Sequence, residues 1–151
     1  MLNKLSDKLD GTIIVVVDGP EKKNLNKSNI INLGWVIGDK LSQIYRSCDL
    51  FSVPSKTDTF GQVSVEAMAS GLPIAAYNTI GPNDVVIHNK TGYLCDNLEE
   101  SCNNILEMIK YSSVRDNCIN NSKTFSWDSM IESFIKIKPE SYRKYYLLNI
   151  S

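Results

Sequence analysis

Short apolar runs alternate along the chain with stretches in which apolar residues recur every three or four positions. A continuous apolar run of β-branched residues indicates a strand buried on both faces of a parallel sheet, whereas the longer spacing indicates a helix with one apolar face. On this basis we expect strands near residues 12–17, 30–33, 49–53, 73–77 and 92–95.

Helical patterns fill the segments between these strands. Asp39 can cap a helix over residues 40–48, whose apolar residues fall on one face. Residues 61–70 are also predicted to be helical despite their valines, because Gly71 and then Pro73 follow in the order that ends helices.

The chain after the last strand carries helical patterning from Leu98 to about Ile137, with breaks near Ser112 and Ser126. Strand and helix alternation predicts an α/β fold with an open, mostly parallel, Rossmann-like sheet and helices on both faces. We expect a single domain over residues 1–151, of which about 138–151 could form a C-terminal tail.

Composition narrows the classes of function. The 151 residues are 42% hydrophobic and 22% charged with a formal charge of -1, which gives no electrostatic case for nucleic acid or an anionic membrane. We expect no transmembrane segment, because the longest apolar run, Ile13 to Val17, is far too short. The four cysteines lack metal-ligand spacing, and no export signal is recognisable, so reduced thiols in a cytoplasmic protein are expected.

The segment "PSKTDTFGQVSVEAMASG", residues 54–71, carries the most informative pattern. It reads as the loop and helix that follow the third strand, so the loop is expected at the carboxyl edge of the sheet, where such folds bind ligands. Glu66 stands within an apolar helix, and an unpaired buried carboxylate is costly, which predicts a binding partner for it.

The start of that helix should offer backbone N–H groups and the positive end of the helix dipole. The residues expected to present these donors are Thr59, Phe60, Gly61 and Gln62. Asp58 and Glu66 are then expected to flank one pocket, where carboxylates accept hydrogen bonds from hydroxyls and N–H groups bind anionic oxygens. A polyol joined to a phosphate, such as a sugar nucleotide, suits this combination.

The stretch "SKTDTFGQVSVEAMASGLPIAAYNTIGPNDVV" resembles the donor-binding region of family 4 retaining glycosyltransferases of the GT-B fold. The signature of that family is an acidic residue, seven intervening residues and a glutamate, here Asp58 and Glu66, followed by Ala-x-Ala-x-Gly-x-Pro. Aspartate stands where glutamate is commoner. The flanking "VVVDGP", "NKTGYL" and "FSWD" are similar to further pieces of the family, so the resemblance covers roughly residues 12–128.

The resemblance implies a role for each matching residue. Glu66 should accept hydrogen bonds from the two ribose hydroxyls, and Asp58, as the catalytic residue, should hold a hydroxyl of the donor sugar. Val63 should pack under the ribose, and the backbone of Val36 should lie beside the base, which is that of UDP or GDP. No cofactor and no tightly bound metal are expected.

The implied activity is transfer of a hexosyl group from a nucleotide-diphosphate sugar to a glycan or lipid acceptor with retention, in polysaccharide or glycolipid biosynthesis. The family also has a first strand and helix carrying an Arg and a Lys, and an N-terminal acceptor-binding domain. Too few residues precede Thr12 for these, so we expect the chain to be the donor-binding part. The missing domain would then be a partner, and the vacant sheet position would favour self-association.

Other interpretations stay open at this point. The chain could be a non-catalytic α/β binding or interaction module, and a GT-B epimerase is a weaker third choice. Glu66 could simply face solvent, and Asp58 could be a helix N-cap. Trp35 is expected to pack rather than to stack on a ligand.

Overall fold

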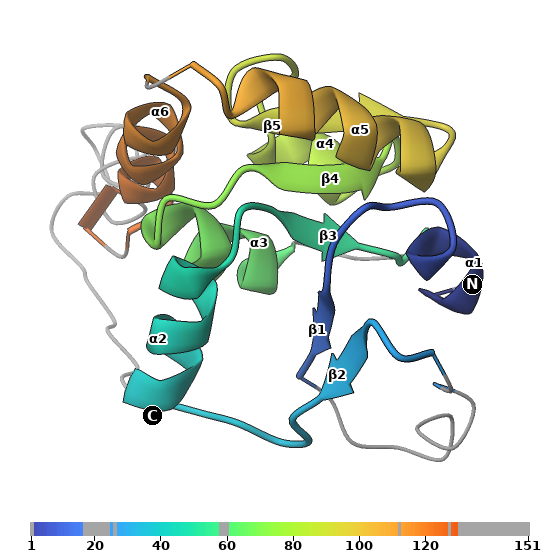
Figure 1. Cartoon of the computed structure of the whole chain (residues 1–151). Coiled ribbons are helices and arrows are strands. Elements are labelled where there is room, and N and C mark those ends of the chain that lie inside the picture. The colour runs from blue at the N-terminus through green and yellow to red at the C-terminus, as the bar shows by residue number, and fades with distance from the viewer. Residues whose placement is uncertain are drawn as a thin grey trace, which may run out of the picture.

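A computed structural model describes residues 2–16, 25, 27–57, 61–111, 113–126 and 128–129 (Figure 1). The five strands predicted from the apolar runs are present. They are β1 (Ile13–Val15), β2 (Ile30–Asn32), β3 (Phe51–Val53), β4 (Ile74–Tyr77) and β5 (Gly92–Cys95).

Helices separate most of the strands, as the spacing predicts. They are α1 (Leu2–Ser6), α2 (Asp39–Ser47), α3 (Gln62–Ala69), α4 (Pro82–Val85), α5 (Leu98–Met108) and α6 (Ser113–Ser122), with a 3-10 turn at Lys123–Phe125. Gly38 rather than Asp39 is the N-cap of α2, so Asp39 lies in the first helical turn instead of capping it. The predicted tail, residues 138–151, lies outside the described residues.

All the strand pairs are parallel, as expected, but they form two sheets. β1 pairs with β2, and β3, β4 and β5 pair in that order. A single sheet would need hydrogen bonds that link β1 or β2 to β3, β4 or β5, directly or through a further strand, and none joins them in the part of the chain that the structure describes. The parallel α/β class is therefore confirmed, with the strands divided between two sheets.

The core lies on both faces of β4, whose four residues are all buried. Ile74 and Ala76 pack against a cluster built from β3, α3, α4 and α6, while Ala75 and Tyr77 pack against residues of α1 and α5. Side chains alternate between the faces of a strand, so β4 contributes to both clusters. This arrangement confirms the prediction of helices on both faces.

Gly92 lets β5 approach β4 closely. A Cβ atom at this position would lie 2.2 Å from the carbonyl oxygen of Ile74 and 2.8 Å from a methyl group of Val86. Only a residue without a side chain fits between these atoms, so Gly92 maintains the register of Ile74 opposite Gly92.

The carboxyl ends of β3, β4 and β5 meet at one edge, on the right in Figure 1, because the three strands are parallel. The loop that follows β3 and the short helix α1 both lie at this edge. Among the described residues, every helix is too short or too polar to cross a membrane.

Candidate functional site

The loop after β3 and the start of α3 form the predicted site. Asp58, Thr59 and Phe60 lie outside the described residues, so their roles stay predictions. Gly61 is the N-cap of α3, with φ 70° and ψ 37°. This left-handed conformation is strained for most side chains, and therefore glycine is needed where the loop turns into the helix.

Gln62 and Val63 form the first turn of α3 and are both exposed, Val63 to 45%. The ladder of the helix begins where the amides of Ser64 and Val65 donate to the carbonyl of Gly61, at 2.8 and 3.2 Å. The N–H groups before them have no intrahelical acceptor, as at the start of any helix. The N–H groups at the start of a helix are suited to anionic or hydroxyl oxygens.

Glu66 lies one turn further along α3 and is exposed. The expectation of a buried carboxylate is therefore wrong. The helix buries Ser64, Ala67 and Met68, which occupy a different face from Glu66. No described Lys, Arg or His lies within 4.0 Å of the Glu66 carboxylate, which leaves it open to hydroxyl donors.

Tyr45 of α2 lies beside Glu66. Burial and, secondly, the negative charge of Glu66 raise the pKa of the Tyr45 phenol. The Tyr45 ring packs edge-on against Phe51, with centroids 5.6 Å apart. The sequence places Tyr45 on the apolar face of α2, but nothing in the sequence indicates that this face meets Glu66.

Val36 lines a shallow hollow of about 480 Å³ on the other side of α2, together with Leu33 and Ile44. Glu66 does not line this hollow, so the structure does not bring Val36 and Glu66 into one pocket.

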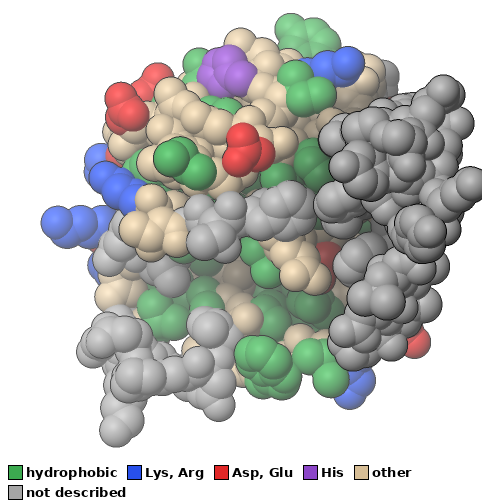
Figure 2. Space-filling model, turned by 180° about the vertical axis from the view of Figure 1, so that it is seen from behind, with side chains coloured by type: hydrophobic (Ala, Val, Ile, Leu, Met, Phe, Trp, Pro, Cys, Tyr) green, Lys and Arg blue, Asp and Glu red, His purple; other side chains and the backbone are tan. Residues whose placement is uncertain are grey.

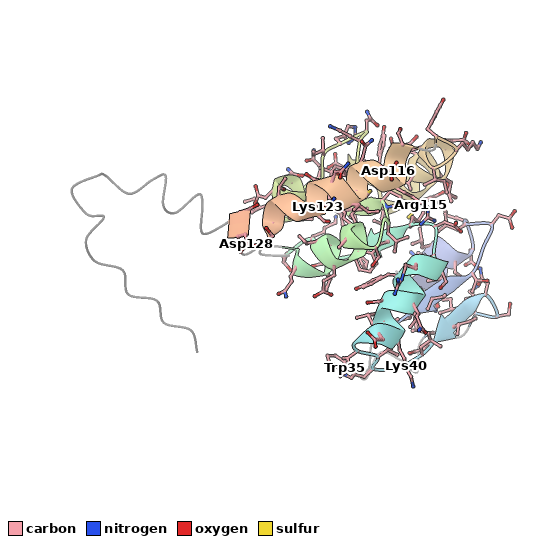
Figure 3. The ribbon with its side chains drawn as sticks, turned by 90° about the vertical axis from the view of Figure 1, so that its left-hand side faces the viewer. Trp35, Lys40, Arg115, Asp116, Lys123 and Asp128 are labelled. Atoms are coloured by element: carbon pink, nitrogen blue, oxygen red, sulfur yellow. The ribbon has the colours of Figure 1, made fainter. Side chains whose placement is uncertain are left out.

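Trp35 is 75% exposed, which contradicts the expectation that it packs. Figure 3 shows Trp35 and Lys40 together at one end of α2, far from Arg115 of α6.

Lys56 is a charged residue of the site that the sequence did not single out. It lies in the loop after β3, and its Nζ atom is 4.7 Å from the centroid of the Tyr77 ring, at the carboxyl end of β4. In the sequence, the feature that could have pointed to Lys56 is its position five residues before Gly61, within the loop of the predicted site.

No group of three or more His, Cys, Asp or Glu side chains that could hold a metal ion occurs among the described residues. The expectation of no tightly bound metal remains a prediction.

Comparisons with known proteins give the family. The family model described as "Glycosyl transferases group 1" matches residues 2–125. Sulfoquinovosyl transferase of Arabidopsis thaliana is 39% identical over 102 residues, which are 62% of this chain and 20% of that protein. The GDP-mannose-dependent alpha-mannosyltransferase of Corynebacterium glutamicum is 37% identical over 94 residues, or 61% of this chain and 23% of that protein.

The fold also matches solved structures. The Anabaena protein HepE, solved in complex with UDP, superposes with a TM-score of 0.72 at 24% identity, over 89% of this chain and 43% of that one. The chain thus spans about a fifth of the length of these two curated relatives and less than half of HepE. Since the family model matches most of the sequence, the chain belongs to the group 1 glycosyl transferases.

Proposed function

We propose that this chain binds the nucleotide-diphosphate-sugar donor of a retaining, family 4 glycosyltransferase of the GT-B type. The observation that carries the proposal is the start of α3 at the carboxyl edge of the sheet, with the exposed carboxylate of Glu66 one turn away. Two similar proteins support it, because HepE was solved with UDP and the Corynebacterium relative is named as GDP-mannose-dependent.

Each residue has a role in this proposal. Glu66 accepts hydrogen bonds from the ribose hydroxyls, and Val63 packs under the ribose. The N–H groups at the start of α3, from Gly61 and Gln62 onward, bind diphosphate oxygens. The backbone of Val36 lies beside the base, which requires the donor to reach across α2 from the start of α3.

Transfer of the sugar gives further roles to residues of the loop between β3 and α3. Asp58 holds a hydroxyl of the donor sugar, and the N–H groups of Thr59 and Phe60 assist it. When the bond from the sugar to the diphosphate breaks, the diphosphate leaves with the electron pair, and its negative charge must be stabilised. A helix terminus supplies only a partial charge, so further cations are required, and we propose no tightly bound metal.

A partner completes the enzyme in this proposal. We infer an acceptor-binding domain, carried by the remainder of a longer protein or by a separate polypeptide, and a glycan or lipid acceptor. The open edges of β1 and β3 are where a further strand or a second copy would pair. The four free cysteines fit a reducing cytoplasm, which is the location we propose.

The second candidate is a non-catalytic module that keeps the fold but not the chemistry. The separation of Val36 from Glu66 favours it, because the two residues line no common hollow. Nucleotide binding distinguishes the two candidates.

The test is calorimetry with UDP and GDP on the wild type, Glu66→Ala and a control, Glu107→Ala, whose exposed carboxylate pairs with Lys110. Hydrogen bonds to a charged group contribute about 1.5–3 kcal/mol, so Glu66→Ala should weaken binding by roughly ten- to a hundred-fold. The control should bind as the wild type does. Equal affinity in Glu66→Ala would refute the ribose assignment.

Sugar transfer is assayed on the same proteins with UDP- and GDP-sugars. The chain alone should not turn over, because positioning the acceptor is worth several kcal/mol of the barrier. Turnover should appear when a polypeptide supplying the acceptor-binding half is added. Turnover by the chain alone would contradict the need for that partner.

A further inference from the structure

Tyr77, the last residue of β4, has positively charged side chains on two sides. The Lys56 ammonium group lies over its ring at 4.7 Å. The ring also lines a cavity of about 180 Å³, together with Lys4 and Lys8 of α1 and the first residues of α5. Three lysines from two separate segments therefore meet at the carboxyl end of one strand.

Two of these lysines have no acidic partner. Lys8 pairs with Glu99 at 2.5 Å. Lys27, in the segment before β2, pairs with Asp7 of the α1 region at 2.6 Å. By contrast, Lys4 and Lys56 have no Asp or Glu oxygen within 4.0 Å among the residues that the structure describes. A local excess of positive charge therefore remains at this edge.

The excess charge lies at the same edge of the sheet as the proposed donor site, with Tyr77 on the face covered by α1 and α5 and α3 on the other face. Val53 of β3 is in register with Ala76 of β4, so the loop after β3 and Tyr77 leave the sheet at the same edge. Lys56 stands in that loop, between the end of β3 and Gly61. Figure 1 shows α1, which carries Lys4, next to the carboxyl ends of β3 and β4.

We propose that Lys56, assisted by Lys4, binds the diphosphate of the donor at the carboxyl edge. The inference rests on the proposed function and adds the full positive charges that the start of α3 does not supply. The Tyr77 ring is buried, but Lys56 is exposed, so water competes for its ammonium group and the contact with the ring is weak, whereas an ammonium group bonds strongly to phosphate oxygens. The Tyr77 ring thus holds Lys56 ready beside the site, and the ammonium group moves from the ring to the phosphate when the donor binds.

The experiment distinguishes the contribution of the diphosphate to binding affinity from that of the nucleoside. Affinities for UDP and uridine, and for GDP and guanosine, are measured on the wild type, Lys56→Gln, Lys4→Gln and Lys56→Arg. Lys90→Gln is the matched control: it removes the same charge from the turn before β5, at the opposite edge of the sheet.

Lys56→Gln should lower the affinity for the diphosphate roughly tenfold, as expected for loss of a charge-assisted hydrogen bond, and leave nucleoside affinity within about twofold. Lys4→Gln should have the same selectivity with a smaller effect, about threefold. Lys56→Arg should retain most of the affinity, and Lys90→Gln should match the wild type. Salt should weaken diphosphate binding less in Lys56→Gln than in the wild type.

The failures are distinguishable. If Lys56→Gln binds UDP and GDP as the wild type does, or loses nucleoside affinity equally, this inference is wrong while the proposed function stands. If the wild type binds neither diphosphate, the proposed function fails and this inference fails with it. Glu66→Ala, measured alongside, should lower nucleoside and diphosphate affinity together, and circular dichroism verifies that each variant is folded.

Discussion

The three-stranded sheet and the two-stranded sheet differ in how far they are covered. All four residues of β4 are buried, between α3, α4 and α6 on one face and α1 and α5 on the other. In β1 and β2 only Val15 is buried, and α2 has no buried residue. Both regions have apolar sequences, so burial is decided by what packs on each side and not by the local pattern.

The exposed apolar residues gather in the less covered region. Alternate positions from β2 toward α2 are exposed, namely Ile31, Leu33, Trp35 and Ile37, with exposed fractions from 46% to 75%. Figure 2 shows the molecule from behind the view of Figure 1. Hydrophobic side chains lie in a hollow in its lower half, at the height of β1, β2 and α2 in Figure 1. A surface of this kind is typical of an interaction site, in agreement with the partner proposed above.

Cysteine labelling should show the largest effect of the cover over the three-stranded sheet. Burial raises the pKa of Cys118, in α6 against the three-stranded sheet, from an ordinary value near 9 to about 12. The reactive thiolate is then roughly a thousand-fold scarcer at pH 8 than for an ordinary thiol, and native Cys118 should label at least that much more slowly. Mass spectrometry after timed alkylation measures the labelling rate. Half-buried Cys48, which packs at the edge of the same core cluster and whose pKa burial also raises, should label faster than Cys118. Equal rates for the two cysteines in the native protein would contradict the protection of Cys118 by burial.

Truncation of core side chains should show the next largest difference. Ile74 of β4 is completely buried, and Ile74→Ala should cost about 2–5 kcal/mol because it leaves a cavity. Ile31→Ala removes the same atoms from a side chain that is 48% exposed in β2, and it should cost less than about 1 kcal/mol. Urea denaturation measures both values. Similar losses would show that the two-stranded sheet is as well packed as the other.

Helix capping should give the smallest difference. The Asn97 side chain accepts a hydrogen bond from the amide of Glu99 at 3.1 Å and caps α5, so Asn97→Ala should cost about 1 kcal/mol of unfolding free energy. Its control is Asn103→Ala, at an exposed position within the same helix, which should cost nothing. α2 has no such bond, because its N-cap is Gly38. A loss in Asn103→Ala as large as in Asn97→Ala would remove the capping explanation.

The sequence predicted the elements well, because their signals are local. The run before Asp18 gave β1, and Gly71 with Pro73 ended α3 close to its observed end at Ala69. The sheet's division does not follow from the apolar runs; only the family resemblance, which implies a missing first strand, predicts a vacant position in the sheet. An apolar run shows that a strand exists, but not which strand it pairs with, and nothing local to β1 or β3 indicates that their facing edges are unpaired.

The site was predicted less completely. Gly61 lies where the chain enters α3, as expected, and Glu66 is exposed, which is the alternative that the sequence left open. The apolar composition of α3 does not show which of its faces is covered, and Val63 is 45% exposed. Lys56 and Tyr45 were missed for another reason. Their contacts, with the Tyr77 ring and near Glu66, join segments distant in the sequence.

The packing of α1 has a consequence for synthesis on the ribosome. Leu5 is buried against residues of β4 and α5, such as Ala75 and Ile105, which are translated much later. Until those residues emerge, Leu5, Leu9 and Ile13 have little to pack against and stay accessible to chaperones. These side chains are therefore synthesised early and buried late.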